Sequence, residues 1–293
     1  MSRRTLVTIA VCAALAIGTG FLVPKALASR YDPAVWHEPQ SVAEQPAEET
    51  PAGTGGQAPP LTLVSVSFTG EFLGWAMRDK QTGVTIGENL EQTSSTESMI
   101  KTWLVADFLR TEDKPTSYEL DQAEEAIRWS DDDAAQVLYE KNGGDASIER
   151  MIEMCELTDT KVYPDWWSRT QMSPRDAVRL GECIANGTAA GPQWTDWLVN
   201  EMRNVAGTTA AADQEERRGG GRWGIIDGVP AASADQVAIK NGWTSIGSDG
   251  NWHLNCLAFT DGWTMAVMMR YPDELGLDYG AQICESIASQ LLT

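Results

Sequence analysis

The sequence predicts an α+β fold in which two strands come first, a block of helices follows, and three strands and a helix end the chain. Three observations predict it: β-branched alternation within residues 62–78, apolar residues at helical spacing across residues 98–186, and short β-rich segments after Trp223. The simplest assembly is a five-stranded antiparallel sheet with flanking terminal helices and an inserted all-helical lobe. The cleft between the two lobes is the natural place for a site.

The first 61 residues differ in composition from the rest of the chain. Residues 1–28 hold two early arginines, an apolar run and a small-residue pattern that ends at Ala28. This is typical of a signal peptide, and an uncleaved N-terminal membrane anchor is the alternative. Either one puts the rest of the protein outside the cytoplasm, secreted or held at the outer face of the cell membrane. Residues 29–61 are rich in Pro, Glu and Gly, so we expect a disordered linker before a domain at 62–293, whose helical lobe spans about 98–222.

The five strands are predicted where β-branched and aromatic residues lie between turn residues. Gly70 and Glu71 are expected to form a turn that joins the first two strands in a hairpin. The predicted strands are Thr62–Thr69, Phe72–Arg78, Gln236–Ile239, Trp252–Phe259 and Trp263–Arg270.

The helices are predicted from apolar residues three and four apart and from capping residues. Ser173 before Pro174 is a typical N-cap, and Asn186-Gly187 is a typical stop. We expect Glu215–Gly221 to be an exposed flexible loop. The predicted helices are Ser98–Arg110, Tyr118–Trp129, Asp132–Lys141, Ser147–Cys155, the helix that Ser173 opens and Asn186 ends, and Asp278–Leu291.

Composition narrows the function classes. The net charge is −20, from 22 Lys and Arg against 42 Asp and Glu, and such a chain repels phosphate backbones and anionic lipids. We therefore expect no nucleic-acid partner. The only histidines are His37 and His253, of which His253 is expected to pack rather than to catalyse, and no Cys-x-x-Cys pair occurs. We expect no metal, no cofactor and a monomer that does its acid–base chemistry with Lys, Ser, Tyr, Asp or Glu.

Four cysteines follow the N-terminal apolar run. An even number in an exported chain favours two disulfides, for which three connectivities are open, and four buried free thiols are the alternative. The cysteines are Cys155, Cys183, Cys256 and Cys284.

A Ser-x-x-Lys motif opens the most apolar of the predicted helices. Ser98 lies at the N-terminus of that helix, and Lys101 lies one turn further on the same face. A desolvated lysine can accept the proton of a serine nucleophile, and the helix N-terminus stabilises a developing anion. The pair therefore indicates a nucleophile and its base.

Two further triplets follow in an order that suits the same chemistry. Ser130-Asp131-Asp132 lies at a joint between helices, where a second serine could relay a proton to a leaving nitrogen. Lys240-Asn241-Gly242 ends an apolar strand, where a lysine could bind a substrate carboxylate and Gly242 leaves room for the substrate. Each triplet alone is more often a helix cap or a strand end. Their common order is the stronger signal.

On these motifs, residues 62–293 resemble the class A β-lactamase and penicillin-binding transpeptidase superfamily, and more narrowly a group of short exported actinobacterial serine hydrolases. The resemblance implies a β-lactamase/transpeptidase-like fold and a cell-wall-related acyl-serine hydrolase that attacks the amide of β-lactams or related peptidoglycan peptides. The stretches that carry it are Ser98–Lys101, Ser130–Leu138, Arg222–Ile225, Lys240–Thr244 and Trp252–Asn255.

The resemblance also implies a role for each motif residue. Ser98 is the nucleophile, Lys101 its base, and Ser130 the group that passes a proton to the leaving nitrogen. The backbone N–H groups of Ser98 and Trp243 form the oxyanion hole. The residues expected to bind substrate are Asp132, Lys240, Asn241, Gly242 and Trp243.

Three departures from the family pattern put efficient turnover in doubt. Asp132 stands where the family has Asn, and an ionised carboxylate cannot donate a hydrogen bond. Asn241 replaces a hydroxyl residue. No Glu-x-x-Leu-Asn pattern follows Ser130, and Asp165 is the nearest stand-in for its deacylating Glu. A D-Ala-D-Ala peptidase and a non-catalytic wall-binding module that keeps the fold are therefore the alternatives.

Proximity within this two-lobe fold selects among the disulfide connectivities. Cys155 and Cys183 lie on helices of the same lobe, and Cys256 lies on a late strand against which the helix with Cys284 should pack. We therefore favour Cys155–Cys183 and Cys256–Cys284. The candidates for the cleft wall are Trp166, Trp167 and Trp243.

Overall fold

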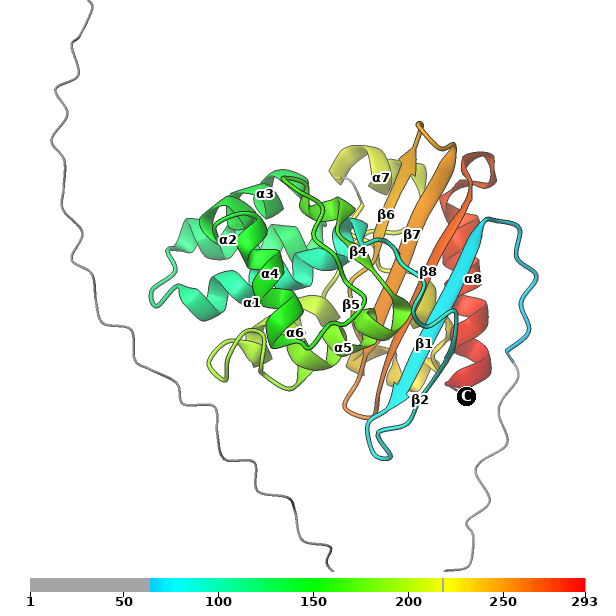
Figure 1. Ribbon diagram of the computed structural model, residues 1–293, viewed down its shortest axis with the longest axis horizontal. Coiled ribbons are helices and arrows are strands. Elements are labelled where there is room, and N and C mark those ends of the chain that lie inside the picture. Colours follow the sequence, from blue (N-terminus) through cyan, green and yellow to red (C-terminus); the bar gives the residue numbers. More distant parts are fainter. Residues whose placement is uncertain (1–63, 218, 293) are drawn as a thin grey trace, which may run out of the picture. The chain divides into compact units, whose positions relative to one another are not determined.

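The computed structural model describes residues 64–217 and 219–292 (Figure 1). The signal peptide or anchor predicted at 1–28 and the linker predicted at 29–61 lie outside these residues. Within the described part of the chain, no helix is both long and apolar enough to cross a membrane.

The sheet is antiparallel throughout, in the order β2-β1-β8-β7, with β5 and β6 both paired to β7. β5 and β6 lie end to end along β7 and are separated by Lys240 and Asn241. The Lys240 N–H still donates to the Leu257 carbonyl at 2.9 Å, so Lys240 keeps its place at the sheet edge. The strands are β1 (Phe72–Asp79), β2 (Thr85–Glu88), β5 (Ala238–Ile239), β6 (Gly242–Ile246), β7 (Asn251–Phe259) and β8 (Trp263–Pro272).

The α+β prediction is confirmed, with six strands in place of five. The strand predicted at Thr62–Thr69 is wrong, since its described residues form no strand. This segment lies against the last helix, where the Ser65 N–H donates to Gln290 Oε1 at 3.0 Å and the Thr69 N–H to Tyr279 Oη at 2.6 Å. Its alternating apolar residues pack on the core without joining the sheet, and β2 is the partner of β1 instead.

The helices follow the sequence closely in the first part of the lobe. Ser173 caps its helix by accepting from the Asp176 N–H, as predicted. Two helices were not predicted, and one of them takes up the start of the expected loop at Glu215–Gly221. The helices are α1 (Lys101–Thr111, preceded by a 3₁₀ turn at Glu97–Ile100), α2 (Ser117–Arg128), α3 (Asp132–Lys141), α4 (Asp145–Met154), α5 (Pro174–Ala185), α6 (Thr195–Arg203), α7 (Ala211–Arg217) and α8 (Gly276–Leu291).

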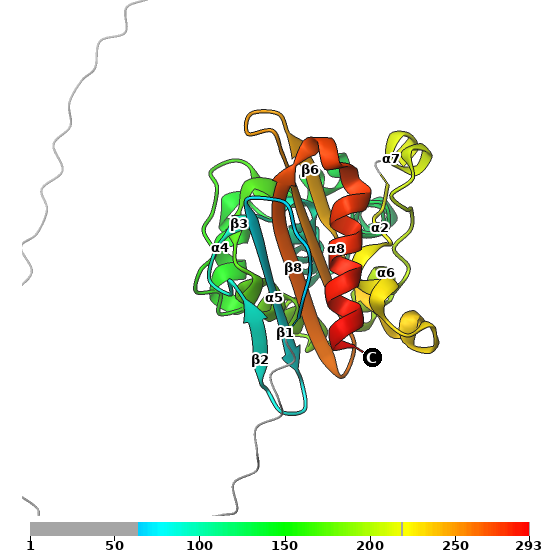
Figure 2. The same ribbon diagram turned by 90° about the vertical axis from the view of Figure 1, so that its right-hand side faces the viewer.

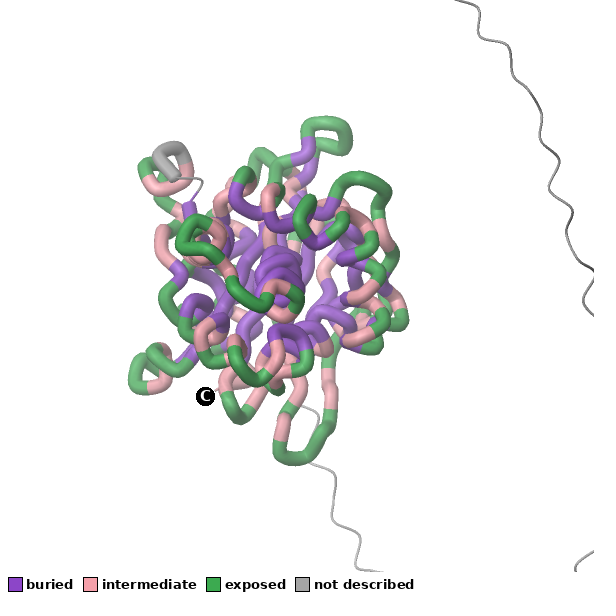
Figure 3. The backbone as a smooth tube through the Cα atoms, turned by 90° about the vertical axis from the view of Figure 1, so that its left-hand side faces the viewer, coloured by how far each residue is buried: buried purple, intermediate pink, exposed green. Residues whose placement is uncertain are grey.

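The sheet lies between α8 on one face and the helical lobe on the other (Figures 1 and 2). α5 packs directly on the lobe side of the sheet, where a Cβ on Gly181 would lie only 2.7 Å from the Thr264 side chain. α1 is buried from Lys101 to Leu109, which explains its wide apolar face, and buried backbone fills the interior of the lobe (Figure 3). A lysine within such a helix must find its partners inside the protein.

One disulfide lies in each half of the fold. Cys155, at the end of α4, is joined to Cys183 on α5, and Cys256 on β7 is joined to Cys284 on α8. This is the pairing that the sequence analysis favoured. Two disulfides are compatible with an extracytoplasmic protein, because such bonds persist in oxidising compartments.

Candidate active site

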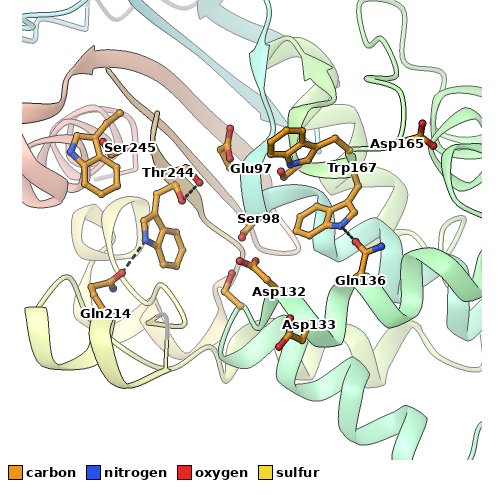
Figure 4. A pocket seen from close by; sticks show the side chains of 15 residues that line it. Glu97, Ser98, Asp132, Asp133, Gln136, Asp165, Trp167, Gln214, Thr244 and Ser245 are labelled. Carbon is orange, nitrogen blue, oxygen red and sulfur yellow. Dashed lines mark hydrogen bonds between the residues drawn. The ribbon is translucent and has the colours of Figure 1, made fainter. Parts of the chain in front are cut away.

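A pocket of about 660 Å³ lies between the helical lobe and the sheet edge (Figure 4). Its lining comes from the turn before α1, from α3, from the segment before α5, from α7 and from β6 and β7. Ser98, Ser130, Asp132, Asp165 and Trp243 all contribute to it. Residues separated by more than 140 positions in the sequence therefore meet in one place.

Ser98 lies in the 3₁₀ turn that opens α1, and Lys101 is the first residue of that helix. β6 passes very close to this turn. A Cβ on Gly242 would lie 2.7 Å from the Ser98 backbone nitrogen, so only glycine permits the approach. The backbone of β6, including Trp243, is thereby held beside the Ser98 N–H, as an oxyanion hole formed by these two residues requires.

Lys101 joins the first motif to the second. Its side chain is fully buried, and Nζ donates to the Ser130 carbonyl, to Ser130 Oγ at 3.3 Å and to Asp132 Oδ1 at 2.6 Å. Nζ also lies 5.3 Å from the centre of the Trp167 ring, within cation–π range. These contacts hold the Lys101 ammonium group beside Ser130 and Asp132.

Ser130 is held in an unusual backbone conformation between two lysines. Its φ is +57°, a left-handed value that costs free energy for a residue other than glycine. Lys240 Nζ donates to Ser130 Oγ at 2.8 Å, from the side opposite the helical lobe. The following Asp131 caps α3, with Oδ1 accepting from the Ala134 N–H at 2.8 Å. The strained turn thus aims the Ser130 hydroxyl at the sheet edge.

Lys240 is completely buried. Burial, reinforced by the nearby charge of Lys101, holds its pKa well below the usual range, and the Asp132 carboxylate only partly opposes this. Its hydrogen bond to Ser130 Oγ fixes the direction of that hydroxyl. Its binding of a substrate carboxylate remains a prediction.

Asn241 is used differently from the expectation that its amide donates to a substrate. Both hydrogens of Nδ2 are engaged, with the Gly221 and Trp223 carbonyls each at 2.8 Å. An amide has only two such hydrogens, so Asn241 anchors the 221–223 segment beside the pocket. A Cβ on Gly221 would lie 2.8 Å from the Trp243 ring, which shows how tightly this segment packs.

The tryptophans expected in the cleft wall all line the pocket. Trp167 Nε1 donates to Gln136 Oε1 at 3.0 Å, and Trp243 Nε1 donates to Gln214 Oε1 at 2.9 Å. Trp166 is 54% exposed. Asp165, beside it, also lines the pocket, and its backbone N–H donates to Asp145 Oδ2 at 3.0 Å.

Sequence reasoning missed three lining residues of importance. Glu97 resembles an ordinary first-turn acid in the sequence, yet its side chain is buried. Gln214 belongs to α7, a helix that was not predicted. Trp252 lies on a predicted strand, and only the β6–β7 pairing brings it to the pocket. Among the described residues, no group of three His, Cys, Asp or Glu could hold a metal ion.

Comparison with known proteins adds to this geometry. Residues 112–213 match the model of the Beta-lactamase enzyme family. The structure called PBP-A matches with a TM-score of 0.56 and 17% identity over 75% of this chain and 88% of that chain. The chain has the fold of the β-lactamase and penicillin-binding transpeptidase superfamily. The resemblance inferred from the motifs is thus confirmed at the level of the fold.

Two further solved structures have the same superfamily fold. A class A β-lactamase from Mycobacterium abscessus matches with a TM-score of 0.55 and 16% identity, over 77% of this chain and 94% of that chain. A variant of PBP-A, solved as the acyl-enzyme complex with penicillin G, matches with a TM-score of 0.56 and 17% identity, over 75% and 89%. No curated protein matches. The family-model match covers α2 to α6 and the start of α7. It includes Ser130 and Asp132, whereas Ser98, Lys101 and Lys240 lie outside it.

Proposed function

We propose that this protein is an exported acyl-serine hydrolase of the class A type, which attacks the amide of β-lactams or related peptidoglycan peptides through Ser98. The observation that carries the proposal is the position of the Ser130 hydroxyl, 3.3 Å from Lys101 Nζ and 2.8 Å from Lys240 Nζ. This contact joins three motifs into one proton path beside Ser98. The two disulfides support the exported state.

In the proposed acylation, Ser98 Oγ forms a bond to the carbonyl carbon while its proton passes to Lys101. The Ser98 and Trp243 N–H groups bind the oxyanion. The carbon–nitrogen bond then breaks, and Ser130 gives its proton to the nitrogen and is reprotonated from Lys101. The buried, low-pKa Lys240 orients the Ser130 hydroxyl for this step.

We expect deacylation to be the slow half of the reaction. The carboxylates that line the pocket come from Glu97, Asp132, Asp133 and Asp165, and none of them follows the family's Glu-x-x-Leu-Asn pattern. Asp132 is paired with Lys101, and we assign the deacylating water to Asp165 as the nearest stand-in. A weak base at this position predicts an acyl-enzyme that persists after the lactam has been opened.

Intact-mass spectrometry over time, after mixing with penicillin G, tests the proposal. We expect an adduct with the full mass of penicillin G, localised to the peptide that contains Ser98 and decaying slowly. Ser98→Ala should abolish the adduct, whereas Ser67→Ala, which removes an exposed serine outside the pocket, should retain it. No adduct with any β-lactam or D-Ala-D-Ala ester would overturn the proposal.

A non-catalytic wall-binding module is the second candidate. The ion pair between Lys101 and Asp132 favours it, because a charged lysine is a poor base. The hydrogen bonds of Asn241 to the 221–223 segment also favour it, because they leave no amide hydrogen for a substrate carboxylate. Pull-down by peptidoglycan that survives Ser98→Ala, without any acyl adduct in the unmodified protein, would support this alternative. A D-Ala-D-Ala peptidase would instead release D-Ala from a peptide ending in D-Ala-D-Ala.

A further inference from the structure

A buried chain of hydrogen bonds leads away from the pocket on the side opposite the lysines. Glu97, the residue before Ser98, is only 3% exposed although it lines the pocket. Ser95 Oγ lies 2.6 Å from Glu97 Oε1 and also 2.6 Å from His253 Nδ1. His253 Nε2 lies 2.9 Å from Asp249 Oδ2, whose side chain is 42% exposed. These four hydrogen-bonded side chains have no role in the acyl-transfer mechanism proposed above.

The sheet register holds the chain in place. His253 pairs with Thr244 across β6 and β7, and Asn255, two residues further along the same face, donates from Nδ2 to the Ser95 carbonyl at 2.9 Å. Glu97 itself has a left-handed φ of +46°, so its side chain turns away from the course of α1. Figure 4 shows the Glu97 side chain between the Thr244 and Trp167 sides of the pocket.

The three contacts fix how many protons the four hydrogen-bonded side chains hold together. The Ser95 hydroxyl has one proton and can donate it to only one of its two neighbours. If Ser95 donates to His253, then Glu97 must be protonated in order to donate to Ser95. If Ser95 donates to Glu97, then His253 must carry a proton on both ring nitrogens, because Asp249 accepts from Nε2. Loss of the shared proton breaks one of the two 2.6 Å hydrogen bonds.

The surroundings favour the arrangement with a neutral Glu97 and a neutral His253 over the one with two charges. Burial raises the pKa of Glu97, against the hydroxyls of Ser95 and Thr244 and the charge of Arg169, while the Asp132 carboxylate adds to the rise. Burial also lowers the pKa of His253, against its contact with Asp249, and the charges of Arg270 and Arg169 lower it further.

Asp249 stays charged in this arrangement. Burial opposes its ionisation, but the hydrogen bonds from His253 and from the Asn251 backbone hold its pKa below the usual range. A charged Asp249 requires the proton on His253 Nε2. His253 Nδ1 then accepts from Ser95, and Ser95 accepts from the protonated Glu97.

We propose that Glu97 is a positioning residue for acylation of Ser98, kept uncharged by the hydrogen-bonded chain that ends at Asp249. This inference rests on the proposed function. The neutral carboxyl ties the Ser98 turn to β3 (Ser94–Ser95) through Ser95 Oγ. β6, the strand that supplies the second oxyanion-hole N–H group, packs directly against the same turn at Gly242. Ionisation of Glu97 breaks the link to Ser95 and puts a negative charge beside the site where the oxyanion forms.

The first test is the pH profile of acylation by penicillin G, followed by intact mass. The rate should fall by about tenfold per pH unit once the pH exceeds the Glu97 pKa, which lies above the ordinary value of 4.5. Glu97→Gln keeps a donor for Ser95 and cannot ionise, so its profile should lose this fall. Glu88→Gln, an exposed substitution on β2, should retain it. Coincident profiles for the unmodified protein and Glu97→Gln would overturn the positioning role.

The second test reads the proton directly and needs no activity. In ¹⁵N NMR of the full chain, His253 should be neutral with its proton on Nε2 at pH 7, and Glu97→Gln should leave this unchanged. The signals of the other histidine are identified by their loss in His37→Gln. An imidazolium that becomes neutral in Glu97→Gln would overturn the placement of the proton. If no β-lactam acylates the protein at any pH, the proposed function fails, while the NMR result still decides where the proton lies.

Discussion

The two walls of the pocket are built from opposite kinds of chemistry. On one wall, two buried lysines meet at the Ser130 hydroxyl, and the positive charge is balanced by Asp132. On the other, a buried carboxyl, a serine and a histidine form a hydrogen-bonded chain that ends at the exposed Asp249. The first wall was visible as motifs in the sequence, and the second was not. The spacing of residues in the sequence reveals which of them lie on one helix. Contacts between strands that are distant in the sequence become visible only in the folded structure.

Loss of the base on the lysine wall should have the largest effect. Lys101→Met removes the proton acceptor while keeping the apolar stem of the side chain, so acylation by penicillin G should slow by about 10²–10⁴-fold. Stopped-time intact-mass measurements give the rate. Lys114→Met, which removes an exposed lysine, is the matched control and should react like the unmodified protein. A Lys101→Met protein that acylates normally would exclude Lys101 as the base.

Each disulfide should stabilise the half of the fold that contains it. Cys155–Cys183 ties α4 to α5 in the helical lobe, and Cys256–Cys284 ties β7, which carries His253, to α8. Each closes a loop of 28 residues, so replacing either pair by alanines should lower the free energy of unfolding by about 3 kcal/mol. Urea denaturation measures this. Equal stability with and without reductant in the unmodified protein would contradict the expectation.

Asp132→Asn should increase activity. The change removes the negative charge that pairs with Lys101 and adds an amide donor facing the pocket. A charged hydrogen bond is worth about 1.5–3 kcal/mol, so acylation should accelerate by roughly tenfold to a hundredfold. Asp133→Asn, one residue further along α3, is the control for a general change in pocket charge. If Asp132→Asn reacts no faster, the carboxylate is not what limits Lys101.

The smallest expected effect is a preference for the charge of the substrate side chain. The pocket lining contains the carboxylates of Asp132, Asp133 and Asp165, while Lys101 and Lys240 are buried behind it. Among penicillins, ampicillin with its ammonium group should acylate faster than neutral penicillin G, and carbenicillin with its extra carboxylate slowest, by about threefold to tenfold per step. The difference should shrink as salt is added. A faster reaction with carbenicillin would show that the lining carboxylates do not face the substrate.

Local features of the sequence could be predicted because their causes are local. The Ser98–Lys101 spacing places both groups within one helical turn, and Asp131 at the start of α3 is a capping residue wherever that helix lies. The disulfide pairing also followed, since the order of helices and strands already put each pair of cysteines in the same half of the fold.

The features that were missed depend on pairing between distant segments. Residues 64–69 alternate like a strand, but side chains of α8 take their backbone hydrogen bonds, and only the folded sheet makes β2 the neighbour of β1. Asn241 had the right residue type to bind a carboxylate, yet the 221–223 segment uses both of its amide hydrogens.

The sequence by itself therefore determined the fold class, the helix that carries Ser98 and Lys101, and the residue types available for catalysis. The tertiary structure alone decided which partners those residues have. Ser95 and His253 are 158 positions apart, and Lys240 and Ser130 are 110 positions apart. Helix periodicity and capping act over a few residues. Strand register and burial set the contacts across such separations, and through desolvation they shift the pKa of Lys240 down and that of Glu97 up.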